Sequence, residues 1–419
     1  MNLDLSKIKK VFFIGIGGIG ISALAKMALS HRMEVSGVND DESPKTLDPL
    51  RELGINILMT PKMSKSLFDI PEADLYVYSD AWLNRGPEII QSAQKTGKPV
   101  LSYFEALGQF ARQYKVIAIS GTHGKTTTTA MIAEIMTDTG LDPTVVIGSF
   151  MKKFDSNFRK GNGEYLVVEA DEYNRHFLNF SPFITLITNI EADHLDCYRD
   201  LADIQKAFDK LLSQSKNKIM DYIKYLEKVP KLSVPGAHNR MNAAAALAVA
   251  DLLNIKLEDA QKSLSQFSGT WRRLEKRGQT EKGTIIYDDY AHHPTEIRAS
   301  LEALRELYSA GEKKITIVFQ PHLYSRTKAL FNDFAKSFKG ADSIFLLPIF
   351  FAREDKDESI SSEKLASAIC LAGDKAKAFP DFEAAEKFIK DLNLGGNDIL
   401  VTMGAGEAYK IADKVFNFY

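Results

Sequence analysis

A short apolar run that ends in a glycine- and threonine-rich loop constrains this chain more than any other feature. Residues 116–119 form the run, a helical pattern follows the loop, and the loop consists of Gly121, Thr122, His123, Gly124, Lys125, Thr126 and Thr127. Glycines let backbone N–H groups face phosphate oxygens, and the N-terminus of a helix adds positive potential. In such loops the lysine reaches the terminal phosphates and the next hydroxyl reaches magnesium. The loop therefore predicts a nucleotide site on a strand–loop–helix unit.

The spacing of this loop departs from the usual phosphate-binding pattern. Ile119 stands where G-x-x-x-x-G-K-[ST] has its first glycine. The alternative is a turn that only caps a helix. Capping does not explain a lysine placed between a glycine and a run of hydroxyls, so the nucleotide site is the preferred interpretation.

Length, charge and cysteine content exclude several classes of protein. The chain has 419 residues, which predicts two or three domains, and its net charge of -2 offers no bulk attraction to nucleic acid or membrane. Cys197 and Cys370 match no metal or disulfide spacing. The apolar run near the N-terminus is too short for a signal or a membrane span. We expect a soluble, cytoplasmic protein without nucleic-acid or membrane partners.

A second glycine motif opens the chain. A strand is predicted over residues 11–14, a helix begins after the motif, and the motif contains Gly15, Gly17, Gly18, Ile19 and Gly20. G-x-G-x-x-G between a strand and a helix suits any diphosphate, and the alternative is a purely structural tight turn. The next strand ends at Asn39, where a dinucleotide fold has its ribose-binding acid, and a further strand ends at Ser79. The first α/β domain is predicted to cover residues 1–112.

Acidic clusters follow two later strands. The run 165–168 leads into Glu169-Ala170-Asp171-Glu172, and the run 184–187 leads into a polar segment that contains His194. Carboxylates at the end of a strand beside a phosphate-binding loop are well placed for Mg²⁺, which prefers oxygen ligands. Glu169 is the preferred ligand. From the residues alone, His194 is equally a metal ligand or a turn histidine.

Further candidates lie in the second half of the chain. Asn239 and Asn242 fall within one turn of an Ala-rich helix, where they either cap it or bind a base or ribose. Arg272 and Arg273 suit phosphate or carboxylate recognition, or are simply exposed. Two later strands end in D-D-Y-A-H-H-P-T-E, with Asp289 and His293, and in Q-P-H-L-Y-S-R-T, with Arg326. These strand ends predict a third α/β domain with its own ligand edge.

Together, these motifs resemble the Mur ligase family in colinear order along nearly the whole chain. The paired D-D-Y-A-H-H-P and F-Q-P-H-L-Y-S-R segments are the most specific part of the resemblance. It implies an α/β protein of three domains: an N-terminal Rossmann-like UDP-binding domain (1–112), a shortened central P-loop-type ATP-binding domain (113–270) and a C-terminal Rossmann-like amino-acid-binding domain (271–419). The implied activity joins L-alanine to UDP-N-acetylmuramate in peptidoglycan synthesis, with ATP, Mg²⁺ and an acyl-phosphate intermediate. A monomer or weak homodimer is expected.

The resemblance also implies roles for individual residues. Lys125, Glu169, His194, His293 and Arg326 would be catalytic, and Thr126, Glu169 and His194 would hold magnesium. Besides the loop 121–127, ATP would contact Asn239, Asn242, Arg273 and Asp289. The sugar nucleotide would contact Gly15, Gly17, Gly18, Ile19, Gly20, Asn39 and Ser79, and His293 and Arg326 would also face the amino acid and the acyl phosphate.

Three features depart from the family pattern. The interval between Asp196 and Pro235 is short, Asn39 replaces an acid, and residues 57–67 contain no Gly-His pair. The first affects the architecture and the others affect the sugar-nucleotide contacts. Neither Lys206 nor Lys210 can be assigned the carbamylated role that some family members give to a lysine.

Three other functions compete with this interpretation. A related ligase attaches a recycled tripeptide to the same sugar by the same chemistry. A nicotinamide dehydrogenase would use the first glycine loop but leave Lys125 and Thr126 without a role. A non-catalytic binding protein derived from a ligase is compatible with the shortened centre, but the intact catalytic candidates argue against it.

Overall fold

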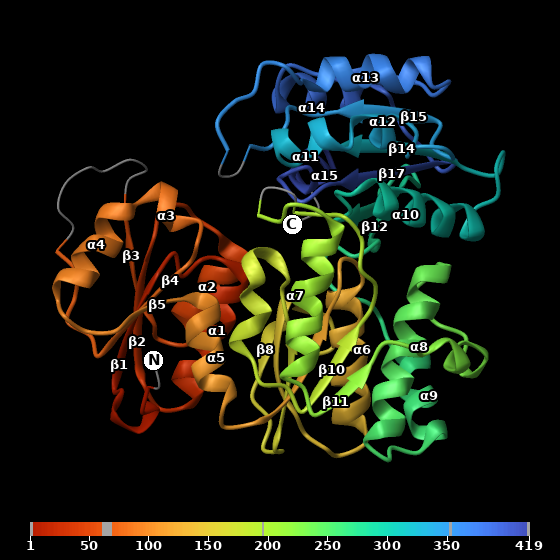
Figure 1. Cartoon of the computed structure of the whole chain (residues 1–419). Helices are drawn as coiled ribbons and strands as arrows, with labels where there is room; N and C mark the ends of the chain where they lie inside the picture. The colour runs from red at the N-terminus through yellow and green to blue at the C-terminus, as the bar shows by residue number, and fades with distance from the viewer. Residues whose placement is uncertain (1–2, 61–68, 195–196, 352–353, 417–419) are drawn as a thin grey trace. The chain divides into compact units, whose positions relative to one another are not determined.

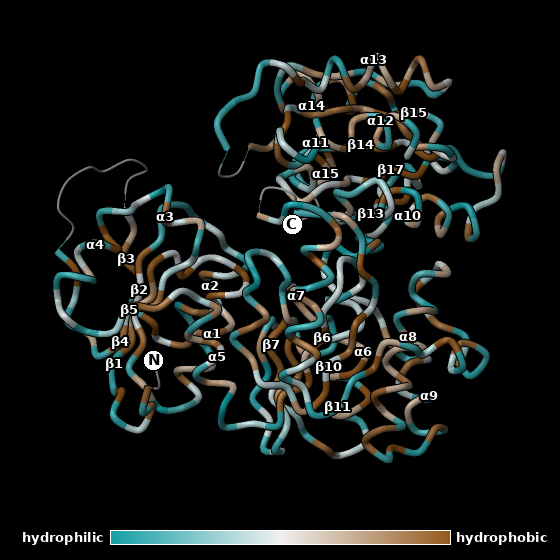
Figure 2. The backbone as a smooth tube through the Cα atoms, viewed as in Figure 1, coloured by the Kyte–Doolittle hydropathy of each residue, from teal (hydrophilic) through white to brown (hydrophobic). Residues whose placement is uncertain are grey.

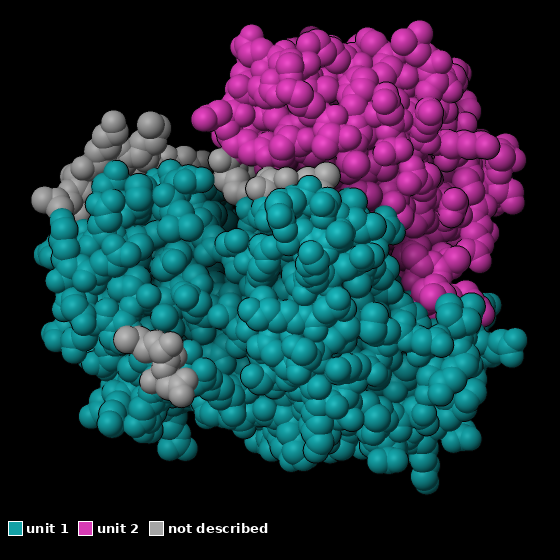
Figure 3. Space-filling model, in the orientation of Figure 1, with its two compact units in different colours: residues 1–193, 197–231, 242–268 teal, residues 194–196, 232–241, 269–419 magenta. Residues whose placement is uncertain are grey.

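A computed structural model describes residues 3–60, 69–194, 197–351 and 354–416, which form three β-sheets with helices (Figure 1). They fall into two compact units (Figure 3). Unit 1 comprises residues 1–193, 197–231 and 242–268, and unit 2 comprises residues 194–196, 232–241 and 269–419. Unit 1 contains the first two sheets, and unit 2 contains the third.

The N-terminal sheet is parallel throughout, in the order β3-β2-β1-β4-β5. Its strands are β1 (Lys10–Ile14), β2 (Glu34–Asn39), β3 (Asn56–Met59), β4 (Leu75–Tyr78) and β5 (Val100–Ser102). Its helices are α1 (Ile19–Ser30), α2 (Pro44–Glu52), α3 (Trp82–Arg85), α4 (Pro87–Lys95) and α5 (Tyr103–Ala111), and a 3₁₀ turn, η1 (Leu5–Lys7), precedes them. The strand order reverses beside β1, so the glycine loop that follows β1 lies at the point where open α/β sheets bind ligands.

The central sheet has the order β11-β10-β6-β9-β7-β8 and is parallel except for the β7–β8 pair. Its strands are β6 (Lys115–Ser120), β7 (Thr144–Met151), β8 (Ser156–Arg159), β9 (Tyr165–Glu169), β10 (Ile184–Ile187) and β11 (Asn217–Ile219). The helices are α6 (Lys125–Asp138), α7 (Leu201–Ser213), α8 (Ala237–Leu252) and α9 (Leu257–Gln266), with 3₁₀ turns η2 (Tyr173–Asn179) and η3 (Ile223–Lys228). Strand β6 lies between β9 and β10, so both acidic segments follow strands that flank the phosphate-binding strand.

The short return from β11 towards α8 is held by two buried tyrosines. The Tyr222 hydroxyl donates to the Thr188 carbonyl, 2.5 Å away, and the Tyr225 hydroxyl donates to Asp251 Oδ2, 2.6 Å away. Met220 and Ile223 beside them are exposed. Two hydrogen bonds therefore attach the return to the central domain although the interval before Pro235 is short.

The C-terminal sheet has the order β12-β13-β17-β14-β15-β16, and only the β12–β13 pair is antiparallel. Its strands are β12 (Glu275–Gln279), β13 (Ile285–Asp289), β14 (Lys314–Phe319), β15 (Ser343–Leu346), β16 (Ala376–Ala378) and β17 (Asp398–Met403). Its helices are α10 (Pro294–Leu307), α11 (Tyr324–Ala329), α12 (Phe331–Ala335), α13 (Ser362–Leu371), α14 (Phe382–Asp391) and α15 (Tyr409–Phe416).

Alternate side chains along a strand pack into the apolar cores on opposite faces of the sheet. In β1, Val11 and Phe13 join the cluster shared with α1 and the central sheet, whereas Phe12 and Ile14 join a second cluster with Tyr76 and Trp82. Figure 2 shows apolar segments on the strands of the sheets and on α6. Burial on both faces explains the unbroken apolar runs in the sequence. Among the described helices, none combines the length and apolarity that a membrane crossing requires.

The α/β class and the three-sheet architecture predicted from the sequence are confirmed. The strands expected at residues 11–14, 116–119, 165–168 and 184–187 are present as β1, β6, β9 and β10. The boundaries 1–112, 113–270 and 271–419 stay predictions, although each range contains one sheet. Of residues 57–67, the segment without a Gly-His pair, residues 61–67 lie outside the described part of the chain.

Candidate active site

The phosphate-binding loop connects β6 to α6, and its two glycines are required by both conformation and space. Gly121 and Gly124 have φ angles of 129° and 82°. A Cβ on Gly121 would lie 2.2 Å from Thr188 Oγ1, and one on Gly124 would lie 2.4 Å from Asn242 Oδ1. Only glycine fits these positions without strain. Asn242, a predicted nucleotide contact, is thus placed against the loop.

Lys125 begins α6 and is almost enclosed by acceptors. Its Nζ donates to the carbonyls of Gly121 and Thr122 and to both carboxylate oxygens of Glu172, at 2.8 and 2.9 Å. Burial by itself would lower the pKa of the Lys125 ammonium, but the negative charges of Glu172, Asp171 and Glu169 outweigh burial and raise the pKa. Lys125 is therefore a fixed positive charge at the mouth of the loop.

Thr126 and Glu169 supply neighbouring oxygen atoms. Thr126 Oγ1 donates to Glu169 Oε2, 3.0 Å away, and Glu169 Oε1 accepts the N–H of Gly148 at 2.7 Å. Two oxygen ligands at about 2.1 Å from an octahedral Mg²⁺ lie about 3 Å apart. The hydroxyl and the carboxylate thus fit neighbouring positions around one magnesium ion, so the donor set suits the predicted metal.

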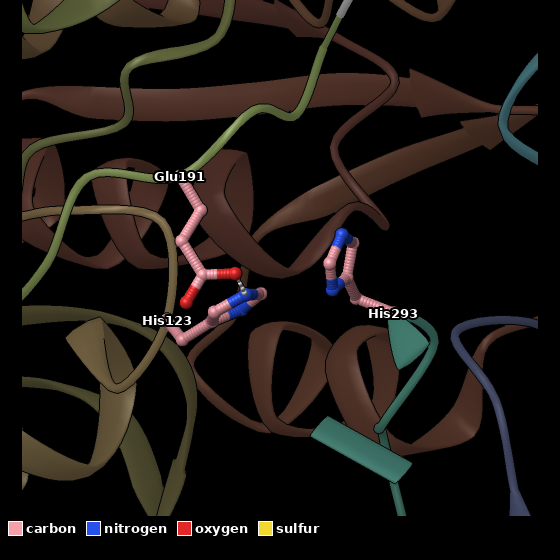
Figure 4. Close-up of side chains that lie close together, drawn as sticks. All are labelled: His123, Glu191 and His293. Atoms are coloured by element: carbon pink, nitrogen blue, oxygen red, sulfur yellow. Dashed lines mark ion pairs between the residues drawn. The ribbon is translucent and has the colours of Figure 1, made fainter. Parts of the chain in front are cut away.

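The segment after β10 holds the loop from the other side. Asn189 Oδ1 accepts the N–H of His123 at 2.9 Å, and the Glu191 N–H donates to Thr122 Oγ1 at 2.8 Å. His123 Nε2 lies 3.5 Å from Glu191 Oε2 (Figure 4). His293, also drawn in Figure 4, belongs to unit 2. Glu191 thus contacts the side chains of both Thr122 and His123, and Thr127 is buried in α6.

The glycine loop after β1 packs closely against the side chains of Trp82 in α3 and Asn39 in β2. A Cβ on Gly15, which has a φ of 81°, would lie 2.3 Å from Trp82 Nε1, and one on Gly17 would lie 2.5 Å from Asn39 Nδ2. Asn39 Oδ1 accepts the Gly17 N–H at 3.1 Å. Asn39 is buried and acts here on the loop itself. Ser79 follows β4, and its N–H donates to the Ile14 carbonyl at 3.0 Å, which places it beside the loop.

In unit 2 the predicted residues lie after β13 and β14. Asp289 is buried at the end of β13 and accepts a hydrogen bond from the Ser300 hydroxyl, and burial raises the pKa of Asp289 to about 6. His293 precedes α10, and its Nδ1 accepts the Thr295 N–H at 3.2 Å. Arg326 is buried in α11, with Nη1 3.2 Å from His322 Nδ1.

The adjacent arginines have different environments. Arg272, which has a φ of 56°, pairs with Asp288 at 2.8 Å and donates to the carbonyls of Gly404 and Gly406, so it is a structural link within unit 2. The Arg273 guanidinium lies 5.0 Å from the ring centre of Tyr290. Of the pair, only Arg273 was a predicted nucleotide contact, and that role stays a prediction.

The remaining candidates lie on the helix and segment that the two units share. Asn239, in unit 2, is buried, and its side-chain amide donates to the Pro235 carbonyl at 2.7 Å, so its nucleotide role stays a prediction. His194 is half-buried with a φ of 56°, and the next two residues of its motif lie outside the described part of the chain. The metal role of His194 stays a prediction.

Two residues of the site were not predicted. Glu172 binds Lys125, and Asn189 holds His123 in place. Both belong to motifs recognised in the sequence, but the pattern could not show which acid of E-A-D-E turns towards the lysine. That choice depends on the 3₁₀ turn η2, whose bend the periodicity does not reveal.

Models of three domains match consecutive parts of the chain. They are described as "Mur ligase family, catalytic domain" for residues 10–115, "Mur ligase middle domain" for residues 119–225 and "Mur ligase, glutamate ligase domain" for residues 272–406. The first and third of these parts contain the N-terminal and C-terminal sheets, and the second contains the central sheet except for most of β6.

Named relatives resemble the chain over its full length. The UDP-N-acetylmuramate–L-alanine ligase of Clostridium kluyveri is 36% identical over 466 aligned residues that cover 100% of both chains. The enzyme of the same name from Acetivibrio thermocellus is 37% identical, covering 98% of this chain and 96% of its own. The crystal structure of UDP-N-acetylmuramate–alanine ligase from Thermotoga maritima is 28% identical, with a TM-score of 0.81 over 97% of this chain and 98% of that one. The chain therefore belongs to the Mur ligase family, as its motifs predicted.

Proposed function

We propose that this chain is an ATP-dependent ligase that joins L-alanine to the carboxylate of UDP-N-acetylmuramate, the first amino-acid addition in peptidoglycan precursor synthesis. The observation that carries the proposal is the cluster of Lys125, Thr126 and Glu169, in a chain 36% identical to such a ligase from end to end. An enzyme that uses ATP and a nucleotide sugar belongs in the cytoplasm. A monomer or weak homodimer stays the expectation.

The first step activates the carboxylate. A carboxylate oxygen of the sugar attacks the γ-phosphorus of ATP, the bond from that phosphorus to the bridging oxygen breaks, and ADP leaves. Such transfers depend on positioning and charge neutralisation. Lys125 supplies a positive charge for the β- and γ-phosphates, while Thr126 and Glu169 are the residues that would hold Mg²⁺. When bound, the ion would neutralise charge on the phosphate oxygens.

The second step forms the amide. The amine of L-alanine, having lost a proton from its ammonium form, attacks the acyl carbon. The carbon–oxygen bond to phosphate then breaks, and the nitrogen gives up a second proton, which leaves with inorganic phosphate. We assign His293 and Arg326 to the amino acid and the acyl phosphate, and His194 to a second metal position. His293 Nδ1 accepts a hydrogen bond from Thr295, so the neutral ring carries its proton on Nε2.

The remaining predicted residues would bind the two nucleotides. Asn242 lies against Gly124 of the phosphate loop, which supports its assignment to ATP. Asn239, Arg273 and Asp289 are assigned to ATP from the family resemblance. The glycine loop and Ser79 are assigned to the sugar nucleotide, with Asn39 acting through its hydrogen bond to Gly17.

A phosphate-release assay with a panel of amines tests the proposal. The purified protein, with ATP, Mg²⁺ and UDP-N-acetylmuramate, is offered L-alanine, glycine, L-serine or a tripeptide. We expect turnover with L-alanine and none when the sugar is omitted. A small pocket separates L-alanine from glycine or L-serine by only about 1–3 kcal/mol, so weak turnover of those two is compatible. Preferred use of the tripeptide, or no turnover with any amine, would overturn the proposal.

A further inference from the structure

A histidine outside the predicted site, His176, lies between carboxylates that belong to two different sheets. Its Nε2 is 2.9 Å from Oδ2 of Asp80, and its Nδ1 is 4.0 Å from Oδ2 of Asp171. Asp80 follows β4 of the N-terminal sheet, and Asp171 follows β9 of the central sheet. Both belong to unit 1. One side chain therefore links the two nucleotide-binding halves of this unit.

The imidazole is held in a fixed orientation by aromatic rings. It stacks on Phe104 of α5, with ring centres 4.1 Å apart and planes inclined by 17°, and it meets Tyr173 edge to face at 5.8 Å. Burial alone would lower the pKa of His176, but its contacts with Asp171 and Asp80 outweigh burial and raise the pKa to about 9. The ring thus carries a positive charge at neutral pH.

A strained turn places His176 at this position. Asn174 and Arg175 precede it with φ angles of 48° and 58°. Asparagine tolerates this left-handed conformation, whereas it costs about 1–2 kcal/mol at Arg175. The Arg175 N–H donates to the Glu172 carbonyl and the Phe177 N–H donates to the Asp171 carbonyl, both at 2.9 Å. Strain kept by the surrounding structure is concentrated at functional sites.

Each carboxylate lies beside residues already assigned to a substrate. Asp80 directly follows Ser79, which borders the glycine loop of the sugar-nucleotide site. Asp171 lies between the metal candidate Glu169 and Glu172, the partner of Lys125. His176 therefore connects the loop that would hold the carboxylate donor to the loop that would hold the phosphate-binding groups.

We propose that His176 is a positioning residue that fixes the sugar-nucleotide loop against the acidic loop, so that the sugar carboxylate meets the γ-phosphate in line. This inference rests on the proposed function. Displacement of reacting groups by about 1 Å can cost about a hundredfold in rate. Because His176 acts on alignment, its loss should slow the chemical step and leave the affinity for each substrate nearly intact.

Trapping of the acyl phosphate tests this proposal. With ATP, Mg²⁺ and saturating UDP-N-acetylmuramate but no L-alanine, hydroxylamine converts the acyl phosphate to a hydroxamate, whose rate of formation reports the first step alone. The variants are His176→Gln, Asp80→Asn and the double variant. His31→Gln is the matched control, because His31 also packs against rings, Phe110 and Tyr114, in the same unit. Calorimetry measures UDP-N-acetylmuramate binding in each.

We expect His176→Gln and Asp80→Asn each to slow hydroxamate formation about tenfold or more, while the dissociation constant for the sugar nucleotide changes less than threefold. The double variant should be no slower than the slower single variant, and His31→Gln should stay within twofold of the unmodified protein. An unchanged rate in His176→Gln, effects that multiply in the double variant, or an equal loss of sugar binding would overturn the proposal. If His176→Gln does not fold, Asp80→Asn, at a partly exposed carboxylate, decides alone. No hydroxamate from the unmodified protein would instead refute the proposed function.

Discussion

Replacing Lys125 by Met tests the electrostatic description of the phosphate loop. The side chains of Lys125 and Glu172 are only 17% and 4% exposed, and they meet through hydrogen bonds of 2.8 and 2.9 Å. Removing one member of a buried ion pair costs about 3–5 kcal/mol, because the other charge stays buried without compensation. Since Lys125 keeps some exposure, we expect Lys125→Met to lower the free energy of unfolding by an amount near the lower limit, about 3 kcal/mol.

The paired variant Glu172→Gln separates stability from catalysis. Lys125→Met/Glu172→Gln leaves no buried charge, so its free energy of unfolding should recover to within about 1–2 kcal/mol of the unmodified protein. Turnover should fall at least a hundredfold in both variants that lack Lys125, with UDP-N-acetylmuramate binding retained. Urea unfolding and phosphate release measure the two quantities separately.

Two outcomes would contradict this description of the loop. One is a Lys125→Met protein that is as stable as the unmodified protein at pH 7. The other is a double variant whose stability Glu172→Gln does not restore.

Three further predictions concern neighbouring positions. Gly124→Ala places a Cβ 2.4 Å from Asn242 Oδ1, so we expect the KM for ATP to rise about tenfold, whereas Gly140→Ala, with a similar φ of 83° and open space, should leave it unchanged. Glu169→Gln should raise the Mg²⁺ concentration for half-maximal activity about tenfold, and an unchanged Mg²⁺ titration would contradict the assignment. Burial raises the pKa of Glu134 to about 7 from its ordinary 4.5, so the folded state retains a proton that the unfolded state releases, and stability falls as the pH rises from 4.5 to 7. Glu134→Gln should remove that slope and add about 3 kcal/mol at pH 8 in urea unfolding.

The features encoded by local patterns were predictable from the sequence. Buried strands read as unbroken apolar runs because both faces of each parallel strand are covered. The conformation of the loop from Gly121 to Thr127 was predictable from its residues, because Gly121 and Gly124 stand where the backbone has positive φ angles. Glu169 ends β9, and Thr126 lies just after the loop that follows β6, so their proximity follows once β6 and β9 are neighbours.

The orientation of adjacent polar residues could not be predicted in this way. The pattern favoured Glu169 as the magnesium ligand, and Glu169 meets Thr126, but the pattern did not show that Glu172 would turn towards Lys125. Arg272 turns onto Asp288 and onto Gly404, 132 positions away in the chain, through a positive φ angle that no arginine signals. His176 escaped notice because its nearer partner, Asp80, is distant in sequence and follows a strand of another sheet.

The short return held by Tyr222 and Tyr225 determines where this enzyme tolerates a change in length. Each tyrosine binds the chain to a different part of the central domain, at Thr188 and at Asp251, and the exposed Met220 lies just before them. Lengthening an exposed loop costs only about 0.6 kcal/mol for each doubling. A reporter domain inserted after Met220 would therefore be carried at the surface. Only two residues further on, Tyr222 binds Thr188, which follows β10 beside the phosphate loop.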